Sequence, residues 1–184
     1  MQAGAGQNGP QGESAAGVPV TPVPLVVAVT GHRDLLASEL PGIRERVRAF
    51  MTDLERRYPD LPVVVMSGLA AGADSLVAEE ALALGLKVIA ALPMPRNLYA
   101  EDFAAGAERE HFLALCARAS EFIELPFTPG NTAGLSREPG YNRDRQYAQL
   151  GVFLSAHCHV LLALWDGKSS DLLAIKHPGV ARAL

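Results

Sequence analysis

Five short apolar runs, most of them rich in β-branched residues, alternate with longer stretches in which apolar residues recur at helical spacing. The runs are 25–30, 63–66, 87–92, 121–125 and 159–164, and the helical stretches are 39–57, 72–84, 107–119 and 141–156. Such alternation is typical of repeated βα units, and runs that are apolar on both faces suit strands buried between two layers of helices. The pattern predicts an α/β fold with a doubly wound, mainly parallel sheet of about five or more strands and helices on both faces.

One Rossmann-like domain is predicted at residues 24–184, behind a tail at residues 1–23 that we expect to be disordered. The tail is rich in Gly, Pro, Gln and Ala and almost free of charged and aromatic side chains, so it has little to pack. Cys116 and Cys158 are too few for a disulfide framework, and no apolar run reaches the length of a membrane span. We therefore expect a soluble, cytoplasmic protein with no membrane partner.

The charge balance limits the kinds of partner. Sixteen basic and 20 acidic residues give a net charge of -4, which argues against a broad interface with DNA or RNA. We therefore do not expect nucleic acid as a partner, and a homo-oligomer is left open. No metal is expected either. His157 and His159 precede the last strand, away from the expected ligand edge, and no carboxylate or thiolate set completes a metal geometry there.

The strongest candidate site follows the second predicted strand and runs into a helix as SGLAAGAD. In a doubly wound sheet, ligands bind outside the carboxyl ends of the strands. Gly68 and Gly72 permit tight backbone geometry, so several N–H groups would face a phosphate at the helix N-terminus. The alternative is a close-packed turn in which Asp74 stabilises the helix start. The candidate binding residues here are Ser67, Gly68, Leu69, Gly72 and Asp74.

The segment after the first strand reads TGHRD and would lie at the same edge of the sheet. Thr30 offers a hydroxyl, Gly31 allows the turn, His32 can act as an acid or base near neutral pH, and Arg33 can grip a phosphate with a bidentate fork. The alternative is an ordinary turn in which Asp34 or a later residue caps the next helix.

Weaker candidates occur near the fourth predicted helix and after the last strand. Tyr141, Arg145 and Arg143 open the helix, and Arg145 would hold an anion or stack on a base, unless it lies on a solvated face. Trp165 would form a pocket wall or pack in the core, and Asp166 and Gly167 follow it. The sequence contains no GxGxxG after the first strand, no GxxxxGK[ST] and no GxSxG, which argues against a conventional dinucleotide fingerprint, a P-loop and a serine nucleophile elbow.

Three segments of the chain resemble the SLOG superfamily of Rossmann-like domains, which includes the DNA-processing protein A family and the lonely-guy phosphoribohydrolases. They are VAVTGHRDL, VVVMSGLAAGADSLVAEEALALGLKVIAALP and HVLLALWDG, and the resemblance spans roughly residues 25–168. It implies a nucleotide or nucleotide-derived ligand held by the loops after the first, second and fifth strands. The residues that it carries over are Gly31, Arg33, Ser67, Gly68, Gly72, Asp74 and Asp166.

The chain departs from these relatives in two places. The PGGxGTxxE motif of the phosphoribohydrolases, whose Glu contributes to catalysis, is absent, so the resemblance does not support that activity. Many related proteins have a Gly-Gly-Thr-Ala-like turn after WDG, whereas this chain continues KSSDLLAIKHPGVARAL. Either the site is altered or the sequence is a fragment whose last helix is incomplete.

The leading hypothesis for function is the binding or sensing of a nucleotide-like small molecule, with no cofactor firmly implied beyond such a ligand. The first alternative is an enzyme that hydrolyses or transfers an N-glycosidic bond, aided by a carboxylate such as Asp74, Glu79 or Asp166. The second alternative is single-stranded DNA binding by analogy with the DNA-processing family. The acidic balance and the few aromatic residues argue against it.

Overall fold

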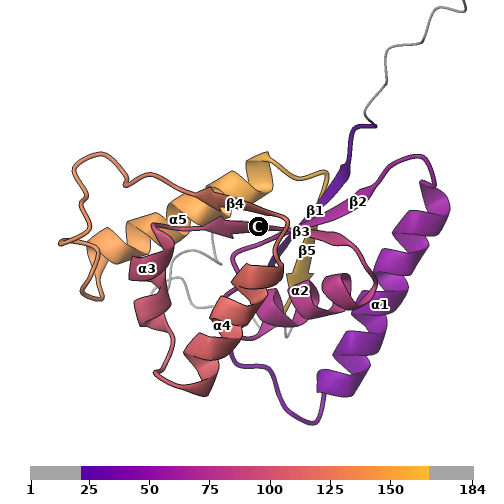
Figure 1. The fold of residues 1–184 in the computed structure, drawn as a ribbon, viewed down its shortest axis with the longest axis horizontal. Coiled ribbons are helices and arrows are strands. Elements are labelled where there is room, and N and C mark those ends of the chain that lie inside the picture. The colour runs from indigo at the N-terminus through magenta and orange to yellow at the C-terminus, as the bar shows by residue number, and fades with distance from the viewer. Residues whose placement is uncertain (1–21, 166–184) are drawn as a thin grey trace, which may run out of the picture.

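Five parallel strands form one sheet in the computed structural model, which describes residues 22–165 (Figure 1). The strands are β1 (Leu25–Gly31), β2 (Val63–Ser67), β3 (Lys87–Leu92), β4 (Glu121–Glu124) and β5 (Val160–Leu164). Their order in the sheet is β4-β3-β2-β1-β5, and each neighbouring pair is parallel. The predicted doubly wound α/β fold is confirmed. Residues 1–21 of the predicted tail and residues 166–184 of the predicted domain lie outside the described residues.

The four predicted helices are present, and two short ones accompany them. The helices are α1 (Leu40–Arg57), α2 (Ala73–Ala83), α3 (Arg96–Tyr99), the 3-10 helix η1 (Ala100–Asp102), α4 (Ala107–Arg118) and α5 (Tyr141–Ala156). The sequence did not predict α3 and η1, because a single turn shows no periodicity. Among the described residues, no helix combines the length and the apolar content that a membrane crossing needs.

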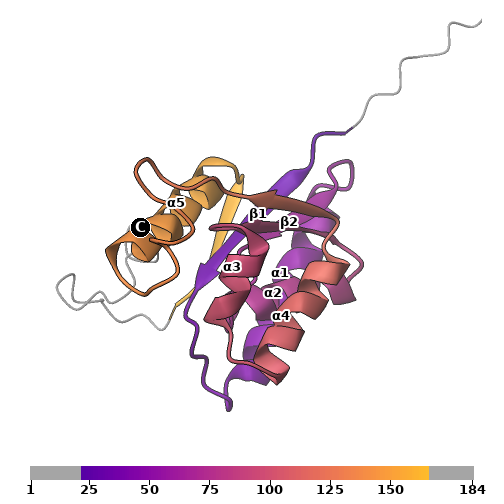
Figure 2. The same ribbon diagram turned by 60° about the vertical axis from the view of Figure 1, so that its left-hand side comes forward.

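The helices form two layers, one on each face of the sheet (Figure 2). Helices α1, α2 and α4 cover one face, where Met51, Val77 and Phe112 pack in the larger apolar core. Helix α5 covers the other face, where Leu150 and Leu154 pack in a smaller core. The chain builds β1 to β4 outward in one direction and then returns through α5 to place β5 beside β1. The strand order therefore reverses between β1 and β5, which is where doubly wound folds bind ligands.

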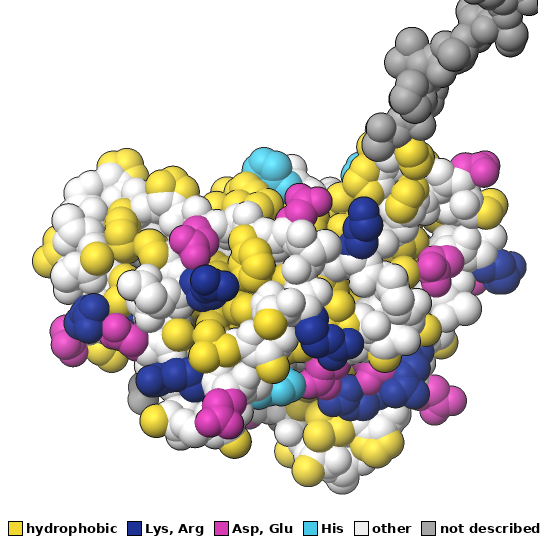
Figure 3. Space-filling view, in the orientation of Figure 1, with side chains coloured by type: hydrophobic (Ala, Val, Ile, Leu, Met, Phe, Trp, Pro, Cys, Tyr) yellow, Lys and Arg dark blue, Asp and Glu magenta, His cyan; other side chains and the backbone are white. Residues whose placement is uncertain are grey.

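Charged side chains tie the three helices of the larger layer together on their outer surface. Arg44 and Arg48 on α1 both pair with Glu80 on α2, whose side chain is buried. Glu79 pairs with Arg44 and, at 2.9 Å, with His111 on α4. Figure 3 shows side chains of both signs gathered where α1, α2 and α4 meet. The pairing explains how a carboxylate such as Glu80 is tolerated beneath the surface.

One buried amide holds the long connection between β4 and α5. Gln146, fully buried on α5, donates from Nε2 to the carbonyl oxygens of Pro93 at 2.8 Å and Pro126 at 3.2 Å. Its Oε1 accepts from the Thr128 N–H at 2.8 Å and from Asn131 Nδ2 at 3.1 Å. All four hydrogen-bonding positions of the amide are used. The side chain therefore fixes residues 126–131 against the carboxyl end of β3.

Candidate functional site

The loops that follow β1, β2 and β5 meet at the edge of the sheet where the strand order reverses. The carbonyl oxygen of His32 accepts a hydrogen bond from the N–H of Ala73 at 3.0 Å, at the first residue of α2. The N–H of His32 donates to the carbonyl oxygen of Leu164 at 3.2 Å, at the end of β5. Two of the predicted site segments, TGHR and SGLAAGAD, are thus in direct contact.

Two glycines make this contact close. A Cβ on Gly31 would lie 2.5 Å from the Cβ of Ala73 and 2.6 Å from the carbonyl oxygen of Leu164. A Cβ on Gly72 would lie 2.2 Å from the carbonyl oxygen of Arg33, and Gly72 also has a φ of +85°. That left-handed region favours glycine. The packing of one loop on the other accounts for glycine at both positions.

The backbone N–H groups of the SGLAAGAD loop bind a carboxylate of their own chain. The N–H groups of Gly68 and Ala70 hydrogen-bond the Asp74 carboxylate, and the N–H of Leu69 donates to Ser67 Oγ at 3.0 Å. Leu69 has a φ of +55°, a backbone conformation that residues other than glycine rarely adopt. Asp74 thus occupies the cradle that the sequence suggested for a phosphate. This arrangement matches the close-packed alternative, in which Asp74 supports the turn.

The Asp74 carboxyl group has a raised pKa. Burial raises its pKa to about 7, although its backbone hydrogen bonds and the nearby charge of Arg33 act in the opposite direction. The Arg33 side chain is exposed. A carboxyl group whose pKa lies near neutrality, beside an accessible guanidinium at a sheet edge, is a feature of functional sites.

A second carboxyl group is influenced by the charge of Arg33 and comes from outside the sequence motifs. Asp102, on η1, accepts hydrogen bonds from Arg143 and from the Tyr147 hydroxyl, both on α5. Burial raises the pKa of Asp102, while the charges of Arg143 and Arg33 oppose the shift. The side chains of Asp102 and Arg143 are 15% and 6% exposed, so this pair lies beneath the surface.

We call six residues the Arg33 cluster because each is linked to another by a hydrogen bond or by the effect of a charge on a pKa. Its members are Arg33, Asp74, Tyr99, Asp102, Arg143 and Tyr147. Tyr99, on α3, is buried, and burial together with the charge of Asp74 raises the pKa of its hydroxyl. Sequence reasoning did not find Tyr99, Asp102 and Tyr147. No sequence pattern singled them out, because Asp102 lies beside a second acidic residue, Glu101, in a segment without periodicity.

The other predicted residues fall in different places. Thr30 lies within β1, paired with Ala163 of β5. Arg145 lies over the ring of Tyr141 at 5.6 Å from its centroid, and Tyr141 is 75% exposed. Asp166 and Gly167 lie outside the described residues. His159 accepts a hydrogen bond from the Val26 N–H at its Nδ1, and within residues 22–165 no three His, Cys, Asp or Glu side chains are grouped as metal ligands.

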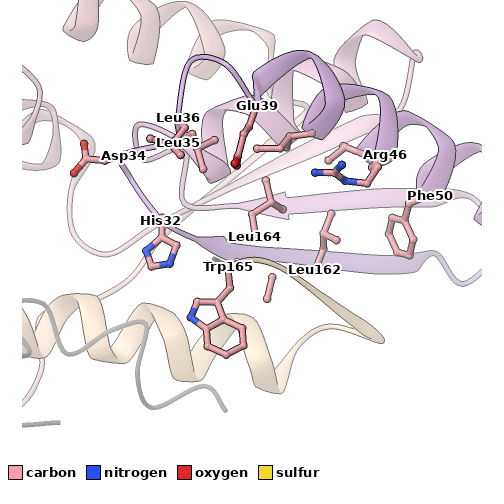
Figure 4. Close-up of a pocket in the computed structure, with 13 residues that line it drawn as sticks. His32, Asp34, Leu35, Leu36, Glu39, Arg46, Phe50, Leu162, Leu164 and Trp165 are labelled. Atoms are coloured by element: carbon pink, nitrogen blue, oxygen red, sulfur yellow. The ribbon is translucent and has the colours of Figure 1, made fainter. Parts of the chain in front are cut away.

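A groove with a volume of about 780 Å³ opens between α1 and β5 (Figure 4). His32 lines the groove, whereas the next residue, Arg33, belongs to the cluster. Trp165 lies at the end of β5, 53% exposed, and also lines the groove. Of the two roles considered for Trp165, the structure supports that of a pocket wall.

No protein-family model and no curated protein matches the chain. Solved structures with a similar fold include DNA processing protein A from Helicobacter pylori, which has a single-stranded DNA binding mode (20% identity, TM-score 0.46). DNA processing protein A from Streptococcus pneumoniae (19%, 0.44) and the structural-genomics target TM1055 (15%, 0.42) are also similar. The matches cover 80%, 77% and 76% of this chain but 57%, 41% and 59% of those chains. Two of the three structures are DNA processing protein A, a family that the sequence motifs resemble. The similarity between these structures and this chain is one of fold.

Proposed function

We propose that the chain binds a nucleotide-type anion at the carboxyl edge of the sheet and that Arg33 contacts the phosphate. The observation that carries the proposal is the exposed guanidinium of Arg33 on a loop packed against the start of α2 and the end of β5. This loop lies where the strand order reverses, which is the ligand edge of doubly wound folds. A guanidinium matches phosphate geometry with two parallel hydrogen bonds.

The neighbouring carboxyl groups leave part of the Arg33 charge available for a ligand. Asp102 already has Arg143 as a partner. Asp74 is bound by backbone N–H groups, and with a pKa of about 7 a large fraction of it is neutral at neutral pH. The backbone cradle itself is filled by Asp74. We therefore assign the ligand contact to the Arg33 side chain and not to the N–H groups of the SGLAAGAD loop.

The test is a calorimetric titration of nucleoside mono- and triphosphates, starting with any nucleotide that mass spectrometry finds in the purified protein. Arg33→Ala should weaken binding about ten- to a hundredfold, because a charge-assisted hydrogen bond is typically worth roughly 1.5–3 kcal/mol. Arg118→Ala is the matched control, since Arg118 is an exposed arginine on α4, away from this edge. Unchanged affinity in a folded Arg33→Ala variant would assign the TGHR loop a purely structural role.

Cleavage of an N-glycosidic bond is a second candidate, favoured by the pKa of Asp74. A carboxyl group that titrates near pH 7 suits general acid or base catalysis. Of the carboxylates proposed from sequence, Glu79 pairs with Arg44 and His111 outside the cluster, and Asp74 lies within it. Chromatography of a nucleotide after incubation decides between the two functions. Release of free base that is lost in Asp74→Asn supports the enzyme, and an intact nucleotide supports the binding protein.

Single-stranded DNA is the third ligand to test. The net charge of -4 argues against it, whereas DNA processing protein A from Helicobacter pylori has a single-stranded DNA binding mode. We expect no binding of a labelled oligonucleotide at micromolar protein and physiological salt, because few phosphate contacts are available. Fluorescence anisotropy at low and physiological salt measures this. Tight, salt-sensitive binding would favour the DNA-binding function instead.

A further inference from the structure

The groove between α1 and β5 has a floor of apolar side chains. Ile43 and Phe50 from α1 and Leu162 and Leu164 from β5 line it, and Trp165, which projects from the opposite side of β5 to Leu164, lies at its margin (Figure 4). Its volume of about 780 Å³ lies within the range of small-molecule pockets. Such pockets combine an apolar lining with a few well-placed polar groups. The polar groups of this groove therefore indicate what it would bind.

Arg46 is the cation of the groove. Helix α1 carries five arginines, and within residues 22–165 four of them form ion pairs, whereas Arg46 forms none. The Nη1 atom of Arg46 lies 3.6 Å from the position that a Cβ on Gly42 would take. The side chain therefore extends back along α1 by about one turn, toward the carboxyl edge of the sheet. A glycine at position 42 leaves room for it.

Two carboxylates line the groove near the same edge. Asp34, in the loop after β1, and Glu39, just before α1, are both exposed, and neither has an ion-pair partner in the described part of the chain. Carboxylates accept hydrogen bonds from hydroxyl or ammonium groups and repel a second anion. Figure 4 shows the Glu39 carboxylate among the lining side chains and the Asp34 carboxylate pointing away from them, so the groove offers one cation, one acceptor and an apolar floor.

We propose that this groove is a second ligand site, which binds a small amphipathic organic anion. The apolar, ring-sized body of the ligand lies against Leu162 and Leu164, its anionic group pairs with Arg46, and a hydroxyl or amine donates a hydrogen bond to Glu39. The site adjoins the proposed nucleotide site, because His32 lines the groove and Arg33 does not, so the two proposals are tested with different variants, Arg46→Gln and Arg33→Ala. Success or failure of one proposal therefore leaves the other standing.

The dye 8-anilinonaphthalene-1-sulfonate is a suitable probe, since it has aromatic rings, one sulfonate and an amine that donates a hydrogen bond. Trp165 is the single tryptophan of the chain and lies at the margin of the groove. Quenching of Trp165 emission shows that the dye binds within energy-transfer range of this residue, and the Arg46 variant below tests whether it binds in the groove. We expect dye fluorescence to rise to saturation at one dye per chain while Trp165 emission falls in parallel.

Arg46→Gln tests the anion contact without disturbing the core, because Arg46 is exposed. It should weaken dye binding by about tenfold, while Arg118→Gln, on the outer face of α4, should leave it unchanged; circular dichroism checks the fold of both variants. Equal affinity in Arg46→Gln, or dye binding without energy transfer from Trp165, would overturn the proposal. A wild-type protein that does not bind the dye and whose Trp165 is not quenched by acrylamide would also overturn the proposal. This holds whether sedimentation shows a monomer or a dimer.

Discussion

Gly31 lies so close to Ala73 that a Cβ atom on Gly31 would be 2.5 Å from the Cβ of Ala73. Real Cβ atoms do not approach one another this closely, and the neighbours here are a rigid Cβ and the backbone of Leu164. The end of β1 and the start of α2 are therefore joined at a contact that only glycine permits. This contact positions both the Arg33 cluster and the mouth of the groove.

Replacing Gly31 with alanine should destabilise the protein, because the added methyl group forces β1 away from α2 or β5. Overpacking of this kind typically costs about 1–3 kcal/mol in the free energy of unfolding, which urea denaturation measures. Gly134→Ala is the matched control: a Cβ there meets no atom closer than 3.9 Å, so its effect should stay within about 0.5 kcal/mol. Equal stability of the two variants would show that the loops separate at little cost.

Asp74 should make stability fall as the pH rises toward neutrality. Its pKa in the folded protein is about 7, above the ordinary value of 3.8, so the folded state holds the proton more tightly than the unfolded chain. The stability that this group contributes is fully present below about pH 4 and is lost as the pH passes through 7. Urea unfolding of wild-type protein and Asp74→Asn between pH 5 and 8 measures the difference.

The wild type should lose stability relative to Asp74→Asn over that range, and the carboxyl carbon of Asp74 should titrate near pH 7 by NMR. A titration midpoint near pH 4 would mean that water reaches the Asp74 carboxylate. It would then contradict a role for Asp74 as a general acid or base.

Replacing Gln146 with leucine should strongly destabilise the protein. The change removes a partner from the carbonyl oxygen of Pro93 and from Asn131 Nδ2, which are buried, and from the Pro126 carbonyl oxygen and the Thr128 N–H, whose hydrogen bonds are partly buried. Each such loss costs about 1–3 kcal/mol, so the total should exceed roughly 3 kcal/mol. Proteolysis within residues 126–131 should become faster. Glu138→Ala, in the same connection but exposed, should change neither measurement.

The strands and the longer helices could be predicted from the sequence because each repeats a period over many residues. Every strand and each of the four expected helices begins and ends within one residue of its predicted bound. The contact between the TGHR and SGLAAGAD loops was also predictable, since both follow strands at the same edge of a parallel sheet.

The composition of the Arg33 cluster could not be predicted, because it depends on contacts between distant residues. Asp102 and Arg143 are separated by 41 positions in the chain and meet only because η1 and α5 converge at this edge. Helix α3, which carries Tyr99, spans four residues and shows no repeating pattern. The N–H groups of the glycine-rich loop looked available in the sequence, and three-dimensional geometry was needed to see that Asp74 fills their cradle.

The position of β5 beside β1 has a consequence for the order in which the molecule folds. Strands β1 to β4 and the helices between them pair with their neighbours in chain order, so each step closes a short loop. The pairing of Val27 with Val160 instead closes a loop that contains almost the whole domain, and such long-range closure is entropically costly and slow. We therefore expect β5 to join last, both in refolding and during synthesis on the ribosome. Because His32 hydrogen-bonds the end of β5, the groove is completed only at that final step.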